Sequence, residues 1–73
     1  MPKERNWELI NARNRAGLTQ VQVADRVGVT ERSYLYYEAG THTPRGDRAD
    51  RIAQALNSTV SKLFGNEKTT PAA

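Results

Sequence analysis

The sequence has 73 residues and carries 11 Lys and Arg against 8 Asp and Glu, so its formal net charge is +3, a mild basic excess that suits a polyanionic partner. This length allows one small domain, and the absence of cysteine excludes a disulfide framework or a thiolate metal site, which leaves apolar packing to hold the fold. A polar start, MPKERNWE, and apolar runs of only two or three residues exclude a signal peptide and a membrane span, so we expect a cytoplasmic protein that binds no membrane.

The first two predicted helices lie near the beginning of the chain. Apolar side chains recur at roughly helical spacing over residues 6–16, and Gly17 follows at the position where a left-handed residue ends a helix. Thr19 can cap a second helix over residues 20–27, about two turns long, and Gly28 can close it. The valines of this second segment alternate only once before the helical period returns, so a helix is favoured over a strand.

The middle of the chain predicts a third helix followed by a loop. Thr30 can accept a hydrogen bond from an early backbone N–H of this helix, and Glu31 places a negative charge at its positive amino end. The helix runs to about Ala39 and ends at Gly40. A loop follows over residues 41–44, because the proline at its end removes a donor and favours extended backbone before it.

The last part of the chain predicts two more helices. Helical spacing resumes over residues 46–56, and Asn57 can end that helix in a left-handed conformation. Thr59 can cap a last short helix that ends before Gly65. We therefore expect an all-α domain of five helices over residues 6–65, between a flexible amino-terminal arm at residues 1–5 and a disordered carboxy-terminal tail at residues 66–73.

The second and third predicted helices are joined by a very short turn, made only of Gly28, Val29 and Thr30. So tight a connection makes the two helices cross steeply, which is the geometry of a helix-turn-helix. Residue types at three positions support it. Ala24 must be small where the third helix crosses, Gly28 must tolerate a positive φ, and Tyr34 must bury apolar surface.

The side chains of the third helix sort onto two faces when each residue turns it by about 100°. Tyr34, Tyr37 and Glu38 share one face, and we expect this face to lie against the core; Trp7 of the first helix is expected in the core as well. An outward pair of Leu and Tyr next to an arginine indicates a partner surface. The outward residues are Glu31, Arg32, Leu35, Tyr36 and Ala39.

These motifs resemble the Cro and phage-repressor type of helix-turn-helix regulator, known as the XRE type. The likeness spans about residues 8–65 and is carried by GLTQ at 17–20, VADRVGVT at 23–30, YEAG at 37–40, Pro44, IAQAL at 52–56 and LF at 63–64. The resemblance implies a five-helix, phage-repressor-like domain whose third helix lies in the major groove of double-stranded DNA. It also implies a homodimer on a pseudo-palindromic operator, in a protein encoded by a bacterium or a phage.

The resemblance implies a set of DNA contacts and a set of structural residues. Gln20 matches the phosphate-anchoring glutamine of the family, and Arg45 matches a position that approaches the backbone or minor groove in some relatives. Arg13 and Glu38 match a pair that ties the first helix to the end of the third. The candidate DNA contacts are Gln20, Thr30, Glu31, Arg32, Leu35, Tyr36 and Arg45, and the candidate structural residues are Arg13, Ala24, Gly28, Tyr34, Tyr37 and Glu38.

The chemistry of the outward side chains leaves some roles open. Arg32 can donate a bidentate pair to guanine, and its alternative is an ordinary solvated charge. Glu31 can accept from the cytosine amino group, or it can serve only the helix end and repel phosphates. Leu35 and Tyr36 can contact a thymine methyl group or the DNA backbone, or their exposure can be incidental.

Several positions depart from the pattern of the family. Gly46 and Ala49 stand where relatives usually have larger apolar residues, so we expect the fourth helix to be weakly packed. The dimer surface, commonly built near the last helix, is not located by the sequence. A run of alternating charges favours a solvated helix face over a phosphate-binding cluster. The run consists of Arg45, Asp47, Arg48, Asp50 and Arg51.

The function that these features favour is repression of transcription by occupying a DNA operator. The alternative is a small protein-interaction module in which the Leu35 and Tyr36 patch binds another protein and DNA is not bound. An enzyme is not expected, because the chain has no cysteine, no Gly-rich phosphate loop and no histidine paired with a nucleophile. His42 lies in a loop without other ligand-type neighbours, so no metal, cofactor or small-molecule ligand is implied.

Overall fold

The computed structural model describes residues 5–65, and every regular element in this range is helical. The elements are α1 (Trp7–Ala16), α2 (Gln20–Val27), α3 (Glu31–Ala39), α4 (Gly46–Ala55) and a final π-helical turn, η1 (Ser61–Gly65). The predicted all-α fold of five helical segments is therefore confirmed. The predicted arm and tail lie outside the described residues, apart from Arg5.

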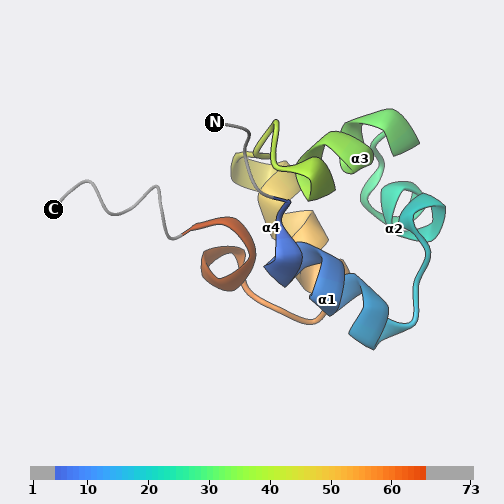
Figure 1. Ribbon diagram of the computed structural model, residues 1–73, viewed down its shortest axis with the longest axis horizontal. Helices are drawn as coiled ribbons and strands as arrows, with labels where there is room; N and C mark the ends of the chain where they lie inside the picture. Colours follow the sequence, from blue (N-terminus) through green and yellow to red (C-terminus); the bar gives the residue numbers. More distant parts are fainter. Residues whose placement is uncertain (1–4, 66–73) are drawn as a thin grey trace, which may run out of the picture.

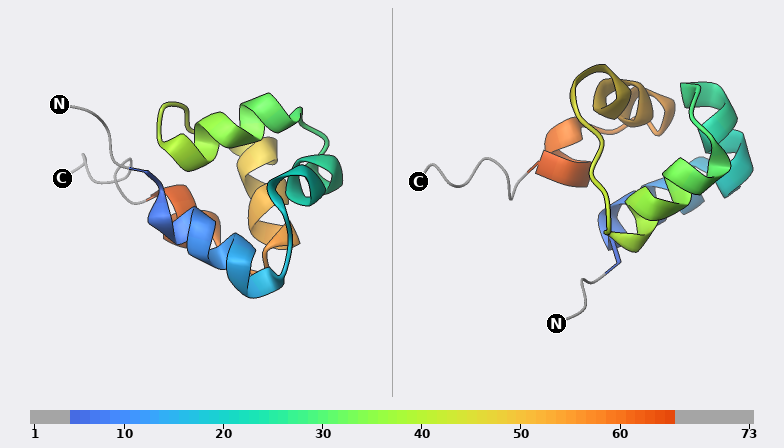
Figure 2. Two further views of the ribbon diagram at one scale, coloured as in Figure 1. Left: turned by 45° about the vertical axis from the view of Figure 1, so that its right-hand side comes forward. Right: turned by 90° about the horizontal axis from the view of Figure 1, so that it is seen from above.

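The helices pack around one core, with α2 against both α3 and α4, and α1 against both α3 and η1. In Figure 1, α2 is seen nearly end-on while α3 runs across the picture, so the two cross steeply. The helix α4 passes behind α3 and α1 in Figure 1, and η1 brings the chain back beside α1 (Figures 1 and 2). A side-chain hydrogen bond from Asn6 to the backbone oxygen of Leu63, 2.9 Å long, joins the start of α1 to η1.

Hydrogen bonds at the helix ends explain why the sequence predicted the helix bounds closely. Thr19 accepts from the N–H of Gln22 at 3.1 Å, and the side chain of Gln22 accepts in return from the N–H of Thr19 at 2.9 Å. At the other end of the domain α4 stops at Ala55, one residue before the predicted end. Asn57 follows with a φ of 56°, the left-handed conformation that was predicted.

The turn between α2 and α3 depends on backbone conformation at one glycine. Gly28 has a φ of 78°, and the N–H of Val29 donates to the oxygen of Ala24 at 3.0 Å. An added Cβ at Gly28 would meet only the end of the Arg51 side chain, at 3.7 Å, so the left-handed φ rather than lack of space favours glycine here. Ala24 is buried beneath this turn.

Among the described residues the core contains thirteen buried apolar side chains, and Tyr34 is the largest of those that are fully enclosed. The prediction that Trp7 belongs to this core is wrong, because its side chain is 55% exposed. The buried residues of α1 are Leu9 and Ala12. Trp7 precedes Leu9 by two positions, or about 200° around the helix, and therefore points to the opposite side.

The helix α4 packs through small residues. Ala49, where a larger side chain was expected, is only 3% exposed and belongs to the core together with Ile52. Gly46 and Ala49 also line a groove of about 930 Å³ between α4, the loop before it and η1. The small residues therefore allow burial of α4 but leave a hollow beside its amino end.

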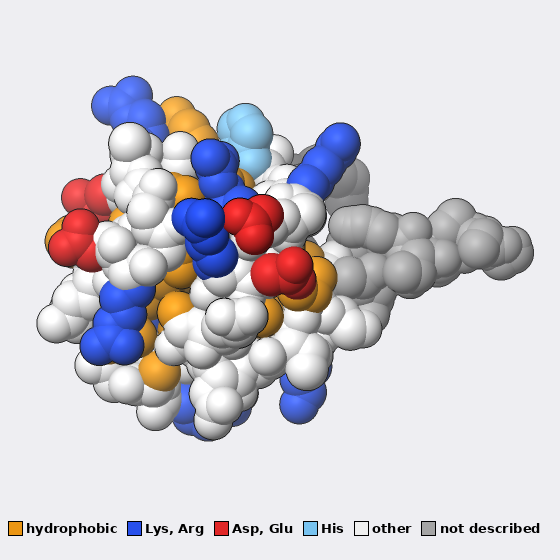
Figure 3. Space-filling view, turned by 180° about the vertical axis from the view of Figure 1, so that it is seen from behind, with side chains coloured by type: hydrophobic (Ala, Val, Ile, Leu, Met, Phe, Trp, Pro, Cys, Tyr) orange, Lys and Arg blue, Asp and Glu red, His pale blue; other side chains and the backbone are white. Residues whose placement is uncertain are grey.

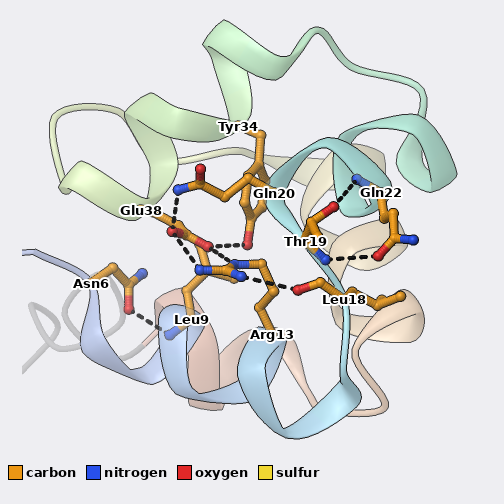
Figure 4. A network of polar contacts seen from close by, with 9 residues as sticks. All are labelled: Asn6, Leu9, Arg13, Leu18, Thr19, Gln20, Gln22, Tyr34 and Glu38. Carbon is orange, nitrogen blue, oxygen red and sulfur yellow. Dashed lines mark hydrogen bonds and ion pairs between the residues drawn. The ribbon is translucent and has the colours of Figure 1, made fainter.

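One carboxylate joins three of the helices (Figure 4). Glu38, at the end of α3, accepts from Arg13 Nε of α1 at 2.6 Å, from Tyr34 Oη at 2.7 Å and from Gln20 Nε2 of α2 at 3.0 Å. Arg13 also donates to the backbone oxygen of Leu18 at 3.0 Å, in the link between α1 and α2. Within residues 5–65 no buried side-chain nitrogen or oxygen lacks a hydrogen-bond partner.

The pKa values of this network follow from its burial and its hydrogen bonds. Burial by itself raises the pKa of Glu38, but the hydrogen bonds from Arg13, Tyr34 and Gln20 together outweigh it, so the pKa lies below its ordinary value. Burial, and then the hydrogen bond to Glu38, raise the pKa of Tyr34, which keeps its phenol protonated as a donor. The hydrogen bond to Glu38 raises the pKa of Arg13.

The network predicts a large difference between two acidic residues when each is replaced by its amide. Glu38→Gln should lower the free energy of unfolding by on the order of 3 kcal/mol, because Arg13 is left without a charged partner in a site from which water is largely excluded. Asp47→Asn is the matched control, because Asp47 and Arg51 form an exposed ion pair at 3.1 Å, and it should cost less than about 0.5 kcal/mol. Urea unfolding followed by circular dichroism at neutral pH measures both.

The comparison of wild type with Glu38→Gln also predicts how the free energy of unfolding depends on pH. A depressed pKa stabilises the fold above the pKa of an unfolded glutamate, about 4.3, and this stabilisation disappears as the pH falls through the lower pKa of the folded protein. The stability difference between wild type and Glu38→Gln should therefore shrink on acidification from about pH 5. A difference that stays constant to low pH would contradict an ionised Glu38 at the centre of the network.

Candidate nucleic-acid interface

The helix α3 presents four side chains on its outer surface. Glu31, Arg32, Leu35 and Tyr36 are all exposed, with exposed fractions of 37% for Leu35 and 41% for Tyr36. The burial pattern agrees with the faces derived from the helical angle, since the opposite side of α3 carries the buried residues. Large apolar groups beside charged ones in this position form a surface suited to contact with another molecule.

Contacts from other helices hold the inner face of α3, so the opposite face of the helix is turned toward solvent. The rings of Tyr34 and Tyr37 pack edge to face, with centroids 6.4 Å apart and planes at 89°. Tyr34 donates to Glu38, and Tyr37 accepts from Arg48 Nη1 at 3.2 Å. The bond from Arg48 joins α3 to α4, and the bonds from Arg13 and Gln20 to Glu38 join it to α1 and α2. They limit rotation of α3 about its own axis, so its outward side chains keep a defined arrangement.

The amino end of α3 contributes backbone donors as well as side chains. Thr30 accepts from the N–H of Ser33 at 3.1 Å, and its hydroxyl also donates to the Ser33 hydroxyl at 3.1 Å. The structure therefore uses the Thr30 side chain as the helix cap. The first N–H groups of a helix point outward along its axis and attract anions such as phosphate, whereas the carboxylate of Glu31 at the same end opposes an approaching phosphate.

Gln20 has a contact that sequence reasoning missed. Its amide nitrogen donates to Glu38 at 3.0 Å, so the predicted phosphate anchor is also part of the network that joins the helices (Figure 4). An amide nitrogen carries two hydrogens, and one of them remains for another acceptor. The two residues are 18 positions apart and no local pattern connects them, so only the packing of α2 against α3 reveals the contact.

Arg45 precedes α4 without capping it by a side-chain hydrogen bond, and it lines the groove beside α4 and η1, to which the outer residues of α3 do not contribute. Two residues that the sequence did not place among the DNA contacts lie next to Tyr36, and one of them, His42, lines the Arg45 groove as well. His42 and Arg48 line a smaller hollow of about 320 Å³ together with Ser33, Tyr36, Tyr37 and Thr43.

The charged side chains away from α3 are mixed in sign. Figure 3 shows basic and acidic groups interspersed on the side opposite to Figure 1, and the basic groups do not form one continuous patch. Arg51 illustrates the pattern, because it pairs with Asp47 and remains more than half exposed. No group of three metal-binding side chains and no helix long and apolar enough to span a membrane occurs in the part of the chain that the structure describes.

Comparisons with known proteins identify relatives among regulators of transcription. The chain is 37% identical over 61 residues to the cryptic phage CTXphi transcriptional repressor RstR of Vibrio cholerae serotype O1, over 84% of this chain and 54% of the repressor. It is 33% identical over 52 residues to an uncharacterized HTH-type transcriptional regulator of Archaeoglobus fulgidus, over 71% of this chain and 74% of that protein. The chain thus spans about half the length of the RstR repressors it matches.

A solved structure and a family model extend the comparison. The DNA-binding domain of the P22 c2 repressor, residues 1–76, has a TM-score of 0.76 to this fold, covering 92% of this chain and 88% of that domain. Because the sequence identity is only 16%, this likeness concerns the fold. A model of the helix-turn-helix family matches residues 9–63. The chain therefore belongs to the helix-turn-helix family, in its XRE or phage-repressor type.

Proposed function

We propose that this chain is a transcriptional regulator that binds double-stranded DNA at specific sequences, with α3 in the major groove. The observation that carries the proposal is the outer face of α3, where Glu31, Arg32, Leu35 and Tyr36 are exposed while the other side of the helix is held by the core. The helix pair around Gly28 presents α3 as the second helix of a helix-turn-helix, the one that enters the groove.

Affinity and specificity come from different parts of this surface. Gln20 and the backbone N–H groups at the amino end of α2, whose first turn has no acidic residue, supply phosphate contacts that position the domain on the duplex. Arg32 supplies base recognition by a bidentate pair to guanine, worth roughly 1–3 kcal/mol of discrimination. Glu31 accepts from cytosine, and Leu35 with Tyr36 contacts thymine methyl groups or the backbone.

The regulatory outcome that we propose is repression by occupancy. A DNA-bound domain of this size covers an operator and excludes other proteins from it without further chemistry. The name of the Vibrio cholerae relative, a transcriptional repressor, supports this direction of regulation. The site of action is then the cytoplasm of the cell, where the DNA lies, and no cofactor takes part.

We further propose that two copies bind a pseudo-palindromic operator as a homodimer. The surface we assign to the second copy is the groove beside α4 and η1, which has apolar walls and carries Arg45 and Asp50. In a two-fold interface each residue of one copy can meet the complementary residue of the other. Arg45 of each copy then pairs with Asp50 of its partner, and each half-site of the operator takes one α3 helix.

Arginine and glutamine variants of the interface should have different effects on operator and random DNA. Arg32→Ala should weaken operator binding by roughly 1–3 kcal/mol and relax the preference at one base position per half-site. Gln20→Ala should weaken binding to all sequences alike, by about three- to tenfold for one hydrogen bond, with an unchanged salt dependence because glutamine is uncharged. Selection of bound sites from random DNA, followed by titration of the selected and random duplexes, measures these effects.

Arg15→Ala is the matched control, because it removes the same charge as Arg32→Ala from an exposed position at the end of α1. It should change binding only through the net charge and should keep the base preference. An Arg32→Ala variant that loses equally on operator and random DNA, or a Gln20→Ala variant that loses on the operator alone, would count against the assigned roles. Absence of any selected sequence would instead favour the protein-interaction module.

Charge reversals across the groove test the homodimer. Asp50→Arg should weaken self-association at least tenfold, because two arginines then face each other across the two-fold axis. Adding Arg45→Asp should restore it, whereas Asp47→Arg, on the same helix but outside the groove, should leave it unchanged. Sedimentation velocity gives the association constants. If the double variant Asp50→Arg with Arg45→Asp dimerises again but still binds the operator weakly, Arg45 also contacts DNA.

A further inference from the structure

The loop after α3 turns back onto the last turn of that helix. Gly40 ends α3 with a φ of 82°, and its N–H donates to the backbone oxygens of Tyr36 and Tyr37. Three further donors from the next two residues converge on the oxygen of Tyr36. They are the N–H of Thr41 at 3.2 Å, the N–H of His42 at 3.4 Å and the hydroxyl of Thr41 at 3.3 Å. Because of these bonds, residue 42 lies beside a residue of α3 six positions earlier in the chain.

The side chains of this pair stack on each other. The ring centroids of Tyr36 and His42 are 4.8 Å apart, and the ring planes are inclined by 36°. Both residues are exposed, so burial does not fix the orientation of the Tyr36 ring as it fixes Tyr34 and Tyr37 in the core. The stack is therefore the contact that selects one orientation of an outward aromatic group on α3.

We propose that His42 is a positioning residue for DNA recognition, which holds the Tyr36 ring in its binding orientation before the duplex arrives. This proposal rests on the proposed function and extends it. Part of the sequence preference then depends on a loop residue that lies outside the helix-turn-helix itself.

The physical basis of the proposal is preorganisation. An exposed tyrosine loses rotational freedom when it is fixed against a base or a sugar, and that loss weakens binding. A ring already held by His42 has lost much of this freedom in the free protein. Removing the stack should therefore weaken operator binding by about three- to tenfold, the size expected for immobilising one such side chain. Random duplex, held through phosphates, should change less than about twofold.

A direct electrostatic role for His42 makes a different prediction. His42 shares the hollow beside Tyr36 with Arg48, whose guanidinium is held by the Tyr37 hydroxyl and supplies a positive charge there. If His42 acted by contacting a phosphate, its loss would weaken operator and random DNA equally, and only a side chain able to donate a hydrogen bond could replace it. A phenylalanine keeps the stacking ring and has no donor, so it separates the two roles.

The test compares His42→Ala and His42→Phe in the full chain. We expect His42→Ala to lose three- to tenfold on the selected operator and less than twofold on random duplex, and His42→Phe to stay within twofold of wild type on both. Asn11→Ala is the control, since Asn11 is exposed on α1 and lines neither the hollow beside Tyr36 nor the groove beside α4, and it should keep the operator preference. Thermal unfolding of all three variants should match wild type, because the altered side chains are exposed.

A double-mutant cycle with Tyr36→Ala identifies the partner of His42. If His42 acts through Tyr36, then Tyr36→Ala with His42→Ala should bind the operator as weakly as Tyr36→Ala alone. The inference would be overturned if the two losses of operator affinity were fully additive. It would also be overturned if His42→Ala lost as much affinity for random DNA as for the operator, or if His42→Phe bound the operator as weakly as His42→Ala.

If the wild-type chain selects an operator and His42→Ala binds it as tightly as wild type, only this inference is overturned. A wild-type chain that selects no sequence would overturn the proposed function as well, since there would be no base recognition to position.

Discussion

The carboxylate of Glu38 is the constraint on which the arrangement of the first three helices depends. It accepts hydrogen bonds from Arg13 of α1, from Gln20 of α2 and from Tyr34 of its own helix, so one acidic group fixes three elements. A domain of this size has a small apolar core, and short helices with few contacts need directional bonds to set their angles. Burying a charge is favourable here only because the donors around it satisfy it fully.

The outer surface of α3 is a consequence of this inner arrangement. Tyr34, Tyr37 and Glu38 occupy the buried side of the helix, so the side chains between them in sequence have to point outward. The same network includes Gln20, which places the proposed phosphate anchor at a fixed position relative to the proposed base contacts. In the proposed function, affinity and specificity for DNA therefore depend on one rigid unit, and this rigidity suits recognition that relies on accurate placement of side chains.

Two features extend the surface beyond the helix-turn-helix. The loop that follows α3 returns to the oxygen of Tyr36 and brings His42 over its ring. Farther along, the small residues Gly46 and Ala49 leave a groove beside α4 and η1 in which opposite charges face solvent. We propose that the first feature holds one base contact and that the second is the surface where two copies meet. Both use residues for which helical periodicity alone indicates no role.

The sequence by itself determined the helices, their ends and the faces of α3, because caps, left-handed terminators and the 3.6-residue period are local properties of the chain. It also indicated the helix-turn-helix through Ala24, Gly28 and Tyr34. Only the tertiary structure decided that Trp7 faces outward, that Gln20 bonds to Glu38 and that His42 stacks on Tyr36. The spacing within α1 places Trp7 and Leu9 on opposite sides but does not say which side is buried. The contacts of Gln20 and His42 depend on how the helices pack together and on how a loop returns.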